Sequence, residues 1–136
     1  MYGDTAALTR RTTQLRDQAA DLRAVADRLV TQADEVAWTG RAADAMRERV
    51  RERAGLLRRL AALHDTAADS LAAHLAEVDR LKDAIAQIER RAEALTAEAR
   101  ARTTQGLAEP GDEVWHGFSG PPAGHRDWLG VSLPGL

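Results

Sequence analysis

The sequence predicts an all-α protein in which an antiparallel helical hairpin is followed by a tail rich in proline and glycine. Only 4% of its 136 residues are aromatic, while alanine is abundant. This composition favours helices packed through small side chains over a layered fold with a bulky core. Residues 4–105 contain no proline and only two glycines, Gly40 and Gly55. Apolar residues recur there with heptad spacing, which is typical of packed helices.

The first helix is expected from Asp4 to Val36, with Asp4 suited to cap its N-terminus. Leucine and small residues alternate in the heptad pattern, which predicts a seam of leucine on one side and alanine on the other. The alanines would allow a second helix to approach more closely than leucines on both sides would. The leucines are Leu8, Leu15, Leu22 and Leu29, and the small residues are Thr12, Ala19, Ala26 and Ala33.

The second helix is expected from Arg41 to Thr104, and its proximal seam contains Leu57, Leu60 and Leu71. At ~1.5 Å per residue it would extend about 95 Å, against about 50 Å for the first helix. The apolar residues in its distal half must therefore be covered by something other than the first helix. Either the chain breaks near residues 63–70 and folds back as a third helix, or the distal stripe pairs with a partner chain. That stripe consists of Val78, Leu81, Ile85, Ile88 and Leu95.

The composition changes after residue 105, so the chain divides into a helical domain, residues 1–105, and a tail, residues 106–136. The tail holds all four prolines and seven of the ten glycines, which rules out a long helix there. It also holds Trp115, Phe118 and Trp128. We expect these rings to anchor the tail on a helical surface or on a partner.

A Trp-Thr-Gly triplet stands between the two helices, in the stretch "AWTGRAADAM". Gly40 supplies a residue that adopts positive φ without strain where one helix ends and the next begins. Trp38 would then lie across the helix ends. One interpretation is that any antiparallel hairpin needs a small turn residue and an apolar plug.

The other interpretation is a resemblance. A helix, a Trp-x-Gly turn and a second helix in a small chain without cysteine resemble the WXG family of early-secreted-antigen-like proteins of type VII secretion systems. The resemblance covers residues 4–75, and its motif residues are Trp38 and Gly40. It implies hairpins that pair into four-helix bundles, as homodimers or with a cognate helical secreted protein, in an actinobacterial or Gram-positive setting. A component of the type VII secretion machinery is a further expected partner. An Arg-to-Lys ratio of 18 to 1 agrees with a GC-rich genome.

The sequence departs from that family at the export signal. In the family, one partner of a pair supplies a C-terminal export signal, usually Tyr-x-x-x-Asp/Glu, whereas the only tyrosine here is Tyr2 and no such motif follows the second helix. The long second helix is more similar to the targeting regions of type VII toxins or to the accessory proteins that bind them. We therefore expect either a secreted substrate or a partner of one, present in the cytoplasm before export and secreted, if at all, without a signal peptide.

Other functions find little support. The formal charge of −2 argues against a nucleic-acid binder, and the arginines of residues 47–59 are predicted to form ion pairs on a solvated face. His64 and His74 would lie about 15 Å apart on one helix, too far for a shared metal. No catalytic motif, cofactor site or membrane span is recognisable. The remaining alternative is a cytoplasmic coiled-coil scaffold with no role in secretion.

Overall fold

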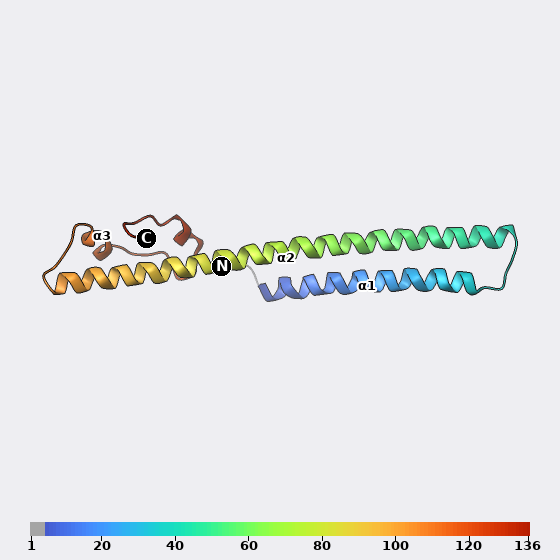
Figure 1. The fold of residues 1–136 in the computed structure, drawn as a ribbon, viewed down its shortest axis with the longest axis horizontal. Helices are drawn as coiled ribbons and strands as arrows, with labels where there is room; N and C mark the ends of the chain where they lie inside the picture. The colour runs from blue at the N-terminus through green and yellow to red at the C-terminus, as the bar shows by residue number, and fades with distance from the viewer. Residues whose placement is uncertain (1–4) are drawn as a thin grey trace. The chain divides into compact units, whose positions relative to one another are not determined.

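The computed structural model describes residues 5–136 and is all-helical there, as predicted, with no strand in that range. Its elements are α1 (Thr5–Glu35), α2 (Arg41–Thr104), the short helix α3 (Asp112–His116) and the 3-10 helix η1 (Arg126–Gly130) (Figure 1). Tyr2 and Asp4 lie outside the described residues. The described chain forms two compact units, residues 5–76 and 77–136, so their boundary lies inside α2, before the change in composition after residue 105.

Helix α2 is not broken at residues 63–70, so the chain does not fold back there as a third helix. The Thr66 hydroxyl donates to the carbonyl of Ala62 at 3.0 Å, one turn back in the same helix, instead of capping a new one. The helix ends at Thr104, and Gly106, two residues further on, has a φ of +72°. The amide of Leu107 donates to the Arg102 carbonyl at 2.8 Å, which completes a glycine-terminated helix end.

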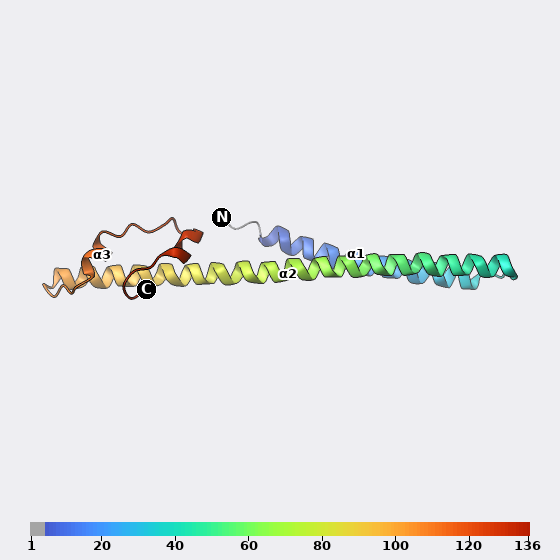
Figure 2. The ribbon, with the colours of Figure 1, turned by 90° about the horizontal axis from the view of Figure 1, so that it is seen from above.

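In the first unit, α1 packs antiparallel against the first part of α2. The two helices run side by side in Figure 1, and in Figure 2, turned by 90°, α1 overlaps α2 along most of its length. The buried residues at their contact are small. We call them the alanine seam: Thr12, Ala19, Ala26 and Ala33 of α1 with Ala43, Ala54, Ala61 and Ala68 of α2. Side chains of this size bury little apolar area each, so a close approach of the helices takes the place of bulky packing.

The structure places the predicted seam leucines beside this seam rather than in its centre. On α2, the central residue Ala61 follows the predicted seam residue Leu60 by one position. Leucine is too large for the helix separation that facing alanines set. We call the resulting half-buried to exposed row the apolar edge: Leu8, Leu15, Leu22 and Leu29 of α1 with Met46, Val50, Leu57, Leu60 and Leu71 of α2.

In the second unit, the tail runs back along the distal part of α2 (Figures 1 and 2). Ile85, Ala92 and Ala99 are buried together with Trp115 and Trp128. Phe118 lies between the two indoles, with ring centroids 5.5 Å from Trp115 and 6.0 Å from Trp128, both in edge-to-face geometry. We call these residues the tail cluster, and Ile88 and Leu95 pack against it. The chain's own tail thus covers part of the distal stripe.

Candidate interaction site

The side of the alanine seam opposite the apolar edge is charged. Four ion pairs join α1 to α2 there, with N–O distances between 2.6 and 3.2 Å: Arg16–Asp69, Arg23–Asp65, Asp27–Arg58 and Asp34–Arg51. Each pair is largely open to solvent and is worth little stability by itself. Together they set how far α1 is shifted along α2, because each fixes the same antiparallel alignment that the buried alanines show.

Arg47 holds the turn between α1 and α2. Its guanidinium donates to the carbonyls of Ala33 at 3.2 Å, Val36 at 2.8 Å and Trp38 at 2.6 Å. The last carbonyls of a helix have no partner within it, so this side chain satisfies the end of α1. At the other side of the turn, Gly40 has a φ of +108°, and its carbonyl accepts the first hydrogen bond of α2, from the amide of Asp44 at 3.0 Å.

The indole of Trp38 is 49% exposed, so it does not plug the turn as the hairpin interpretation requires. Arg47 has the role expected of this ring, although the sequence predicts a solvated, ion-paired face for the arginines of residues 47–59. One signal could have found it. Arg47 precedes Ala54 by seven residues and thus occupies the same heptad position as Ala54, Ala61 and Ala68, which faces α1.

The apolar edge contains a groove of about 370 Å³, lined by Leu29, Met46 and Val50 with Arg49 and Arg53 at its rim. The same side of α2 continues into a row of exposed leucines at helical spacing. These are Leu56, Leu60 and Leu63, of which Leu63 is 64% exposed. Neighbouring apolar side chains that face solvent in this way mark a surface suited to association.

A partly buried ion pair fixes the start of the tail. Arg102 donates to Asp112 through two nitrogens, at 2.7 and 3.0 Å, and the amide of Glu109 donates to the same carboxylate at 2.9 Å. The Arg102 hydrogen bonds, followed by the Glu109 amide, lower the pKa of Asp112 to about 2. Further along, the Trp128 indole donates to the Pro122 carbonyl at 3.1 Å.

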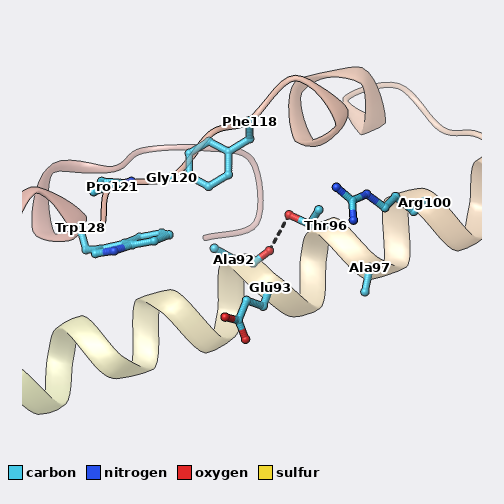
Figure 3. A pocket seen from close by; sticks show the side chains of 9 residues that line it. All are labelled: Ala92, Glu93, Thr96, Ala97, Arg100, Phe118, Gly120, Pro121 and Trp128. Atoms are coloured by element: carbon cyan, nitrogen blue, oxygen red, sulfur yellow. Dashed lines mark hydrogen bonds between the residues drawn. The ribbon is translucent and has the colours of Figure 1, made fainter. Parts of the chain in front are cut away.

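Beside the tail cluster lies a cleft of about 350 Å³ (Figure 3). The tail supplies its aromatic wall, Phe118 and Trp128, together with Gly120 and Pro121, and α2 supplies the opposite wall from Ala92 to Arg100. A Cβ on Gly120 would lie 2.6 Å from the Trp128 ring, so only glycine lets the chain pass this close to the indole. The remaining predicted stripe residues, Val78 and Leu81, are buried and half-buried, respectively.

The histidines of α2 form no metal site. His64 is bonded to the Leu60 carbonyl at 2.9 Å, and His74 is exposed. Across residues 5–136, no group of three or more His, Asp or Glu side chains is placed to hold a metal ion. No helix in the same range is long and apolar enough to cross a membrane.

Comparisons with known proteins leave the family open. No family model matches the chain, and neither curated proteins nor solved structures include a match.

Proposed function

We propose that the protein is a non-enzymatic, WXG-like helical protein that acts by helix-to-helix association in type VII secretion, as a secreted substrate or as a partner or targeting factor of one. The observation that carries this proposal is the half-exposed indole of Trp38 in a glycine-containing turn between two paired helices. Because Arg47 holds the turn, the ring is free to contact another protein.

The apolar edge supports the same proposal. The alanine seam already joins α1 to α2, so the hairpin does not depend on the leucines beside the seam. These leucines are therefore available for contact with another protein. An apolar row along two helices is suited to receive a helix of another chain, whose side chains would fill the groove at Leu29, Met46 and Val50. In this proposal the protein is present in the cytoplasm before export.

The test uses the full-length tagged chain in an actinobacterium with a working type VII system and in the same strain without the secretion ATPase. We expect ATPase-dependent appearance of the chain in the medium, or ATPase-independent co-purification with a helical substrate of that system. Trp38→Ala should abolish whichever of the two is observed, export into the medium or co-purification. It should leave the thermal unfolding temperature unchanged, because the ring contributes little to the hairpin core. Exposed Leu107 provides a control in the tail, and Leu107→Ala should leave both measurements unchanged.

A cytoplasmic scaffold would behave differently. If Trp38→Ala lowers stability and association equally, the triplet serves only the hairpin. If neither export nor co-purification occurs in a strain whose other substrates are exported, the secretion role is wrong and the scaffold alternative takes its place.

A further inference from the structure

Two arginines without a partner among the described residues stand at the groove of the apolar edge. Arg49 and Arg53 line its groove, and neither side chain has an ion pair or a hydrogen bond to any of residues 5–136. Other arginines of the same stretch are engaged, since Arg47 holds the turn and Arg51 and Arg58 pair with α1. The two groove arginines are thus cations beside an apolar floor.

Acidic residues are also absent from the neighbouring positions along the apolar edge. The residues that follow a seam residue by three positions, or precede it by one, lie on the same side of the seam. Arg47 is counted here as a seam position, because it shares the heptad position of the seam alanines. Across residues 8–36 and 46–71, these positions hold Leu, Val, Met, Ala, Gln, His and Arg, and none holds Asp or Glu. The carboxylates of the four inter-helix ion pairs, from Asp27 to Asp69, lie on the opposite side.

A second copy of the chain is poorly matched to such an edge. Two-fold pairing sets one surface patch against the same patch of the partner. Arg53 of each copy would then meet apolar residues and other cations, because the edge positions counted above hold no Asp or Glu. Covering a guanidinium without a partner costs free energy, and opposing like charges add to that cost.

We propose that the apolar edge binds an acidic amphipathic helix of a different protein, whose apolar residues fill the groove and whose Asp or Glu side chains pair with Arg49 and Arg53. This inference rests on the proposed association through the apolar edge and narrows the partner to a heterologous, acidic one. A helix suits the site better than a lipid surface, because Leu29, Met46 and Val50 line a groove between helices rather than a convex face.

The experiment measures binding of two synthetic helices to the full-length chain by titration calorimetry. Both peptides carry leucine at heptad positions a and d, and they differ in having either Glu or Lys at all flanking e and g positions. We expect the Glu peptide to bind at least about tenfold more tightly, a preference that salt weakens. The double variant Arg49→Glu/Arg53→Glu should reverse the preference, and the chain alone should be monomeric by light scattering.

A matched single substitution tests the position of the charge. The Arg59 guanidinium lies 3.7 Å from where a Cβ on Gly55 would stand, which places it away from the groove. Arg53→Glu should therefore weaken binding of the Glu peptide, whereas Arg59→Glu should not. Circular dichroism confirms that each variant keeps its helices.

Three results would overturn the inference: equal binding of both peptides, equal effects of Arg53→Glu and Arg59→Glu, or displacement of the Glu peptide by anionic lipid vesicles. A dimer of the chain alone that Leu22→Asp dissociates would assign the edge to a second copy. That outcome would contradict binding of an acidic partner but would still support association through the apolar edge. The proposed secretion role fails separately, if ATPase-dependent export and substrate co-purification are both absent.

Discussion

Replacing Arg47 tests whether a single side chain holds the hairpin turn. Arg47→Ala removes three hydrogen bonds, to the carbonyls of Ala33, Val36 and Trp38. Bonds to a charged donor are worth more than neutral ones when buried, but the turn is open to water, so we take roughly 0.7 kcal/mol for each. The expected loss is about 2 kcal/mol in the free energy of unfolding.

The measurement is urea unfolding followed by circular dichroism, with Arg51→Ala as the matched control. Arg51 is one turn further along α2 and makes an exposed ion pair with Asp34 at 3.2 Å, so its removal should cost less than about 0.5 kcal/mol. Arg47→Lys should fall between the two, because an ammonium cannot span three carbonyls as a guanidinium does. Equal losses for Arg47→Ala and Arg51→Ala would refute the assignment.

Three further predictions concern the seam and the tail. Ala61→Leu should lower the free energy of unfolding by about 1–3 kcal/mol through overpacking of the seam, and unchanged urea unfolding would contradict the close helix approach. Asp112 has a pKa of about 2, below its usual 3.8, so its contribution to tail docking should be full above pH 3.8 and disappear as the pH falls towards 2. Nuclear magnetic resonance of the tail amides should show that loss, and Asp112→Asn should abolish this part of the pH dependence. Gly120→Ala should loosen the tail, because its Cβ would lie 2.6 Å from the Trp128 ring; protease resistance equal to that of the unchanged chain would contradict this.

The helices could be predicted from the sequence because their determinants are local. A long stretch without proline and with heptad spacing is sufficient to indicate helix, and it located α1 and α2 closely. The centre of their contact was harder to predict. Leucine is more hydrophobic than alanine, so the sequence predicts Leu60 as a seam residue, whereas the structure buries Ala61. Which of two adjacent positions is central depends on how closely the helices approach, and that is a property of both helices together.

The tail and the turn show where prediction from the sequence ends. The rings of Trp115 and Trp128 indicated an anchored tail, but a segment rich in proline and glycine has no periodicity from which its position on α2 could be derived. Arg47 was misassigned because an arginine on a helix usually faces water. Its role depends on three carbonyls that come together only after α1 ends and the chain turns.

The positions of the three tryptophans allow intrinsic fluorescence to report separately on the turn and on the tail. Trp38 is half exposed at the turn, while Trp115 and Trp128 are only 3% and 7% exposed in the tail cluster. A shielded indole emits at shorter wavelength than a hydrated one and resists quenching by solutes such as acrylamide. Quenchable emission therefore reports on the turn and protected emission on the tail. Partner binding at one site and tail release at the other can be followed in the unlabelled chain as two separate signals.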